Sequence, residues 1–122
     1  MKQVLVIGSD RTVRRAFESA LDNVPCEVEF ATDAAEGVEA LRNGNFDLVF
    51  IDLQAPGFDG VGVLEWLRTA GNPVPVFVVT PSADSAVRPL RAAASKGFHY
   101  EPLREPFGSA EILAATTAVL AP

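Results

Sequence analysis

The sequence predicts an α/β domain in which helices cover both faces of a parallel sheet. Short apolar runs alternate five times with segments of helical period, and turn residues separate them. Two of these runs, Val4–Ile7 and Leu48–Ile51, are apolar at every position, which is typical of strands buried on both sides. Together these observations predict a doubly wound, three-layer sandwich with right-handed crossovers.

The first half of the chain has three predicted strands and two predicted helices. The strands are Val4–Ile7, Cys26–Ala31 with the alternation of an edge strand, and Phe46–Ile51. The helices span Asp10–Leu21 and the segment from Ala34 to the turn Asn43-Gly44-Asn45, with Thr32 or Asp33 as the cap of the second. Their apolar faces are Val13, Phe17, Ala20 and Leu21 in the first helix, and Ala34, Val38 and Leu41 in the second.

The second half continues the alternation. A helix from about Asp59, with Val63, Leu64 and Leu67 on its apolar face, precedes a fourth strand at Val76–Val79. Pro89 lacks an amide proton and fits the first turn of a helix, which predicts a short helix at Pro89–Ser95. A fifth strand lies within Phe98–Leu103. A last helix starts near Ser109, and the residues expected to pack it are Ile112, Leu113, Thr116, Val119 and Leu120.

The composition indicates one globular domain over residues 1–122. Of these residues, 48% are hydrophobic and 21% are charged. We expect no membrane association, because no apolar stretch approaches the ~20 residues of a membrane span and no basic-then-apolar leader is present. The net charge of −6 argues against binding of nucleic acid by this domain. Cys26 is the single cysteine, which favours a cytoplasmic location and a packing role in its strand.

Asp52 is the candidate functional residue, because it directly follows the apolar run Leu48–Ile51. Ligands of parallel α/β sheets bind at the carboxyl ends of the strands. The other residues expected at this edge are Gly8-Ser9-Asp10, Thr80 and the residues around Arg104. A purely structural role for Asp52, in which its carboxylate caps the following turn, is the competing interpretation.

The segment Asp52–Gly60 resembles the phosphoacceptor segment of bacterial response-regulator receiver domains, which have the CheY-like, flavodoxin-like fold. A proline stands four residues after Asp52, and an Asp-Gly pair stands seven and eight residues after it. Further matches are Asp47-Leu48-Val49, Val78-Val79-Thr80 and Pro106-Phe107. The resemblance covers the whole chain and implies a five-stranded sheet of order 2-1-3-4-5.

The resemblance implies a role in two-component, or phosphorelay, signal transduction. Asp52 would accept a phosphoryl group from a sensor histidine kinase, and Thr80 would be the switch hydroxyl. Mg²⁺, which prefers hard oxygen ligands, would bind Asp52, Asp10 and the backbone carbonyl of Gln54. No enzymatic activity is expected beyond autocatalytic phosphoryl transfer to Asp52. The expected partners are the kinase, a downstream protein, or a second copy bound through the fourth helix, fifth strand and last helix.

The chain departs from the family at the metal site. The family has two adjacent acids after the first strand, and these positions are Gly8 and Ser9 here. Asp10 stands one position further along, where it can cap the first helix or bind metal through water. Two carboxylates in place of three predict weak or absent Mg²⁺ binding.

A second departure concerns the cation that the family places before its last helix. One residue is inserted between positions 98 and 105, so either Arg104 or Glu105 takes the place of the family lysine. Arg104 would preserve a cation, although its planar fork differs from an ammonium group. The same insertion leaves Tyr100 or Phe98 as the aromatic residue of the fifth strand, and core packing is the competing interpretation for either ring. The lone His99 is expected to be structural or solvent-facing.

Three functions remain open. The first is a phosphoaccepting receiver domain with a degenerate Mg²⁺ site at Asp52. The second is a pseudo-receiver that binds a partner or dimerises independently of phosphorylation. The third is a flavodoxin-like binder of phosphate or flavin, supported by the hydroxyl-bearing loop Gly8–Thr12 at a helix N-terminus. Kinase, output, oligomeric state, and whether the domain stands alone or belongs to a longer chain are left open.

Overall fold

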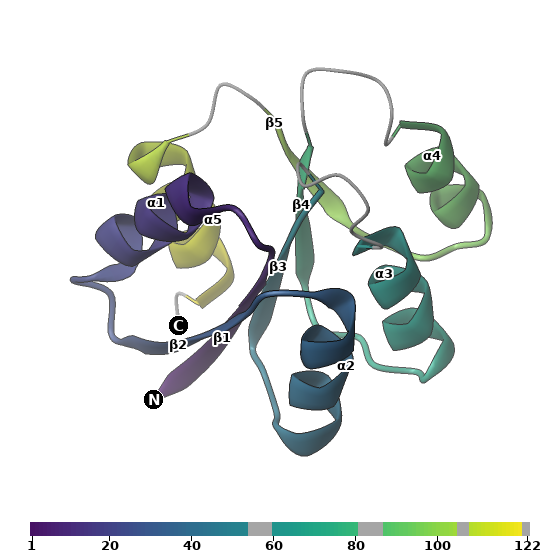
Figure 1. Ribbon diagram of the computed structural model, residues 1–122, viewed down its shortest axis with the longest axis horizontal. Helices are drawn as coiled ribbons and strands as arrows, with labels where there is room; N and C mark the ends of the chain where they lie inside the picture. Colours follow the sequence, from purple (N-terminus) through teal and green to yellow (C-terminus); the bar gives the residue numbers. More distant parts are fainter. Residues whose placement is uncertain (54–59, 81–86, 105–107, 121–122) are drawn as a thin grey trace.

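The computed structural model describes residues 1–53, 60–80, 87–104 and 108–120, with the main chain alone at 80, 87–89 and 104. A parallel five-stranded sheet of order β2-β1-β3-β4-β5 lies at its centre (Figure 1). The strands are β1 (Lys2–Ile7), β2 (Cys26–Ala31), β3 (Leu48–Asp52), β4 (Val76–Thr80) and β5 (Glu101–Arg104). The helices are α1 (Arg11–Leu21), α2 (Ala34–Asn43), α3 (Gly60–Thr69), α4 (Val87–Ser95) and α5 (Ser109–Leu120). The doubly wound fold and the strand order implied by the resemblance are confirmed.

The helices form two layers, with α1 and α5 on one face of the sheet and α2, α3 and α4 on the other (Figure 1). Successive residues of a strand point to opposite faces, so neighbouring positions enter different cores. On the α1 and α5 side, the buried residues include Val4, Val6, Phe17, Leu48, Phe50 and Ile112. On the other side, they include Leu5, Ile7, Val49, Ile51, Leu64, Leu67 and Leu90. Burial on both faces explains the fully apolar sequences of β1 and β3.

Helix α2 resolves the choice between its two candidate caps. The carboxylate of Asp33 accepts a hydrogen bond from the amide of Glu36 at 2.7 Å, so Asp33 is the cap. The hydroxyl of Thr32 instead donates to the carboxylate of Glu36 at 2.9 Å. In α1, the predicted apolar face of Val13, Phe17, Ala20 and Leu21 is confirmed, because all four side chains are buried.

The elements that follow β4 differ slightly from their predicted bounds. Helix α4 starts at Val87, which puts Pro89 third in the helix and within its first turn, as expected. Strand β5 ends at Arg104, one residue beyond the predicted limit. Phe98 and Tyr100 both precede β5 and lie half-buried against the core on the α3 and α4 side. The expectation of an aromatic residue within the fifth strand is therefore wrong for both of them, and the competing interpretation, core packing, is confirmed for both.

The prediction that Leu113 packs into the core is wrong. Its side chain is 41% exposed, whereas Ile112 and Thr116 are fully buried. Successive residues of an α-helix are rotated by about 100°, so only one of two adjacent residues can point straight at the sheet. Ile112, Thr116 and Val119 share the stripe that packs in α5, and Leu113 lies beside it.

Candidate functional site

Asp52 is the last residue of β3 and lies at the carboxyl edge of the central strand. Its side chain is 1% exposed. Strand β1 pairs along one side of β3, with Ile7 opposite Ile51, and β4 pairs along the other, with Asp52 opposite Val79. The amide of Leu53 donates to the carbonyl of Val79 at 3.0 Å and extends this pairing one residue further. The strand ends therefore surround a buried carboxylate, as the sequence predicts.

The register brings two further candidate residues to the same edge. Thr80 is the last residue of β4, directly after the partner of Asp52, and Arg104 is the strand partner of Thr80 in β5. This pairing places the main chain of Arg104 opposite that of the candidate switch residue. Glu105 and Gln54, the latter a predicted metal ligand through its carbonyl, lie outside the described residues.

Asp10 caps α1. One of its carboxylate oxygens, Oδ1, accepts hydrogen bonds from the amides of Thr12 at 2.8 Å and Val13 at 3.2 Å. These are the orphan amides of a helix N-terminus, and an aspartate there stabilises the helix through both hydrogen bonding and charge. The same two amides would be needed by a phosphate bound at this helix end. The cap thus weakens the case for a flavin or phosphate binder.

Gly8 has a role that the sequence reading missed. A Cβ atom at this position would lie 2.7 Å from Cβ of Asp52 and 3.2 Å from its Oδ2. Carbon atoms in contact prefer separations of about 3.5–4.0 Å, so the main chain of Gly8 fits against Asp52 only because it has no side chain. A glycine directly after a buried strand is a known signal of such close approach, but the sequence does not say what approaches it.

The described residues do not fit the three-carboxylate magnesium site of the resemblance. Among residues 1–53, 60–80, 87–104 and 108–120, no group of three or more His, Cys, Asp or Glu side chains could hold a metal ion. The remaining candidate carboxylates are Asp52 and Asp10, and Oδ1 of Asp10 is engaged in the helix cap. Magnesium sites rely on carboxylate oxygens and retained waters, and this donor set has fewer carboxylates than the resemblance implies.

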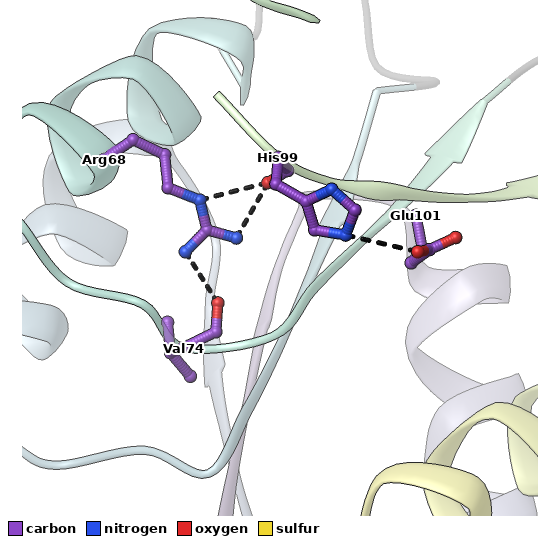
Figure 2. Close-up of polar contacts among 4 residues, drawn as sticks. All are labelled: Arg68, Val74, His99 and Glu101. Atoms are coloured by element: carbon purple, nitrogen blue, oxygen red, sulfur yellow. Dashed lines mark hydrogen bonds and ion pairs between the residues drawn. The ribbon is translucent and has the colours of Figure 1, made fainter. Parts of the chain in front are cut away.

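The segments that lead into β4 and β5 are linked by hydrogen bonds from the side chain of Arg68 (Figure 2). Its Nε and Nη2 donate to the carbonyl of His99 at 3.0 and 2.7 Å, and Nη1 donates to the carbonyl of Val74 at 2.7 Å. Nη1 also donates to the carbonyl of Asn72 at 2.9 Å. Partial burial lowers the pKa of Arg68 from its ordinary value. One guanidinium therefore ties α3 to the segments that enter both strands.

His99 is solvent-facing, as predicted. Its side chain is 73% exposed, and Nε2 lies 3.2 Å from Oε1 of Glu101, an ion pair when the imidazole is protonated (Figure 2). His99 precedes β5, so it lies at the end of the sheet opposite to Asp52. This position excludes direct contact between its imidazole and the candidate site.

The fold and the buried strand-end carboxylate define the class of protein. Residues 4–116 match the family of response regulator receiver domains, and the chain belongs to this family, whose members serve in two-component signalling. The chain is similar to the response regulator MprA of Mycobacterium sp. (strain KMS), with 32% identity over 120 residues. The match covers 97% of this chain and 50% of MprA, so the chain spans about half the length of that relative.

Solved structures have the same fold. The chemotaxis response regulator CheY4 of Vibrio cholerae superposes with a TM-score of 0.79 and 21% identity, covering 98% of this chain and 99% of CheY4. The receiver domain of the Francisella response regulator 1452 superposes with a TM-score of 0.78 and 21% identity, covering 98% and 96% of the two chains. Within the described ranges, no helix is both long enough and apolar enough to span a membrane.

Proposed function

We propose that Asp52 is the phosphoacceptor position of this receiver domain and that its site binds Mg²⁺ weakly. The observation that carries the proposal is the burial of Asp52 at the end of β3, between β1 and β4. Thr80 is the proposed switch hydroxyl, and Arg104 is the proposed cation, supported by the pairing of their main chains. Metal contacts are assigned to Asp52, Asp10 and the carbonyl of Gln54.

Phosphorylation forms a bond between a carboxylate oxygen of Asp52 and phosphorus, and the donor leaves without its phosphoryl group. With acetyl phosphate as the donor, the leaving group is acetate. A carboxylate is a weak nucleophile, and the transferred group carries spread negative charge, so cations near the site determine the rate. A sensor histidine kinase is the proposed natural donor, and the proposed location is cytoplasmic. Partners of the proposed output are a downstream protein or a second copy bound through the α4, β5 and α5 face.

A second candidate function is a phosphorylation-independent interaction module. It is favoured by the engagement of Asp10 in the helix cap and by the absence of an acid at Gly8 and Ser9. In this case the domain binds its partner equally well whether or not Asp52 is available.

The two candidates are separated by treating the protein with acetyl phosphate and Mg²⁺ and measuring its mass. The phosphoacceptor proposal expects the gain of one phosphoryl group in the wild type and none in Asp52→Ala. A Mg²⁺ titration with and without beryllofluoride is followed through Trp66 of α3, which lies under the guanidinium of Arg42. Silence in both assays, with partner binding intact in Asp52→Ala, would establish the second candidate.

A further inference from the structure

The main chain at Gly8 occupies the side of the Asp52 site where the family has its first acid. Because Ile7 pairs with Ile51, the next residues along both strands, Gly8 and Asp52, lie beside each other. The amide of Gly8 donates to the carbonyl of Ala31 at 2.8 Å, which extends the pairing of β1 with β2. Gly8 is therefore hydrogen-bonded to the end of β2 on one side and lies beside Asp52 of β3 on the other.

The atom that a side chain at position 8 would meet is itself fixed. It is Cβ of Asp52, the first side-chain atom of a residue that is 1% exposed and part of β3. The end of a long side chain could change rotamer to relieve such a contact. A Cβ atom moves only when its backbone moves. At 2.7 Å the contact is too short by roughly 1 Å for two carbon atoms. Any residue other than glycine would thus displace β1, β3 or both.

Ser9 offers a contrast one residue later. Its side chain is exposed and already has the Cβ atom that position 8 lacks. A carboxylate at this exposed position needs no new Cβ atom, so it avoids the addition that any side chain would require at position 8. The two missing acids are therefore not equivalent in this chain.

We infer that Gly8 closes the β1 side of the Asp52 site, so that a carboxylate cannot be restored there without displacing Asp52. This inference rests on the proposed function insofar as it explains the weak Mg²⁺ binding. The site is then more than a receiver site from which one side chain has been deleted. Its backbone is closed over the space that the first acid needs, and Ser9 is the remaining position at which an added acid could strengthen Mg²⁺ binding.

The first test measures the packing alone. Gly8→Ala adds one methyl group and should lower Tm by roughly 5–15 °C, the effect of overpacking a buried site in a domain of this size. It should also shift the carboxyl ¹³C resonance of Asp52, which reports displacement of that side chain. Ser9→Ala is the matched control and should change neither quantity. A Gly8→Ala protein with wild-type Tm and an unchanged Asp52 resonance would overturn the inference.

The second test measures Mg²⁺ binding by calorimetry in Gly8→Asp and Ser9→Asp. Ser9→Asp should tighten binding about tenfold or more, as expected for one added carboxylate ligand. Gly8→Asp should bind no more tightly than the wild type and should have a lower Tm. Equal tightening in both variants with wild-type Tm would refute the closure at Gly8. If Gly8→Asp does not fold, the Tm and the Asp52 resonance of Gly8→Ala still test the inference. Failure of Asp52 phosphorylation in the wild type would refute the proposed function but leave the Tm and resonance differences unchanged.

Discussion

Single residues at the carboxyl edge of the sheet shape the surroundings of Asp52. Asp52 ends β3 with its side chain buried, and Gly8 lies against it without room for a Cβ. Asp10 is the first acid after β1, and its Oδ1 caps α1. The proposed metal contact and the helix cap would therefore compete for one carboxylate, and substitution of Asp10 can separate the two.

Asp10→Ala should lower the free energy of unfolding by about 0.5–2 kcal/mol, the usual cost of losing an N-cap. Asp10→Asn should keep the stability within a few tenths of a kcal/mol, because asparagine caps as well as aspartate. Urea unfolding followed by circular dichroism measures both variants. If Asp10 also contacts Mg²⁺, Asp10→Asn should weaken Mg²⁺ binding at unchanged stability. Equal stability of Asp10→Ala and wild type would contradict the capping role.

At the scale of elements, Arg68 holds three segments together at the end of the sheet opposite to Asp52. Its guanidinium donates hydrogen bonds to the carbonyls of Asn72, Val74 and His99. Strand β5 has only four residues, lies at the edge of the sheet and contains Pro102, which has no amide to donate. We therefore expect β5 to depend on Arg68 for its position more than the central strands do.

Arg68→Ala should destabilise the domain by about 1–3 kcal/mol, because the partly buried carbonyls lose a charged donor. Arg68→Lys should recover only part of this loss, since an ammonium group lacks the planar fork that reaches several carbonyls at once. Amide hydrogen exchange should rise most in β5. Arg91→Ala, an exposed arginine of α4, is the control and should change stability by less than about 0.5 kcal/mol. Full rescue by lysine would contradict the proposed geometry.

Two substitutions in α5 show which of two adjacent apolar residues packs in the core. Ile112 is fully buried, and Leu113 is 41% exposed. Ile112→Ala should cost about 2–5 kcal/mol because it leaves a cavity, whereas Leu113→Ala should cost about 1 kcal/mol or less. Thermal unfolding of the two variants under identical conditions measures the difference. Equal losses would show that α5 is rotated relative to the sheet.

At the scale of the whole molecule, stability should depend on pH through Cys26. This residue of β2 is half-buried against the core formed with α1 and α5, and burial raises the pKa of its thiol. The folded state therefore favours the neutral thiol. The contribution of this thiol to the free energy of unfolding is fully present below the ordinary thiol pKa of about 8.5. It falls as pH rises through that value toward the raised pKa of the folded state.

The expected result is that wild-type protein loses more stability than Cys26→Ala between about pH 7.5 and 9.5, an interval that brackets the ordinary thiol pKa. Urea unfolding at several pH values measures this difference, and groups that titrate equally in both proteins cancel. Parallel stability curves for the two proteins would argue against the raised thiol pKa.

Much of the architecture follows from local sequence patterns. The apolar runs of β1 and β3, the face of α1 and the place of Pro89 in α4 were all predictable, because strand burial and helical period are properties of short segments. The position of Asp52 at a strand end followed from the same reasoning. The family also followed, because its phosphoacceptor segment is contiguous in the chain.

Contacts between distant segments needed the folded chain. Gly8 and Asp52 meet only because β1 and β3 pair in one register, and the main chains of Thr80 and Arg104 are partners only because β5 pairs with β4 in another. Sequence spacing leaves such registers open by a residue, which is why it leaves both Arg104 and Glu105 as candidates for the place of the family lysine. The choice of Asp33 over Thr32 and the exposure of Leu113 likewise depend on where neighbouring backbone lies. Periodicity identifies the elements, whereas the distances between their side chains arise only when the sheet assembles.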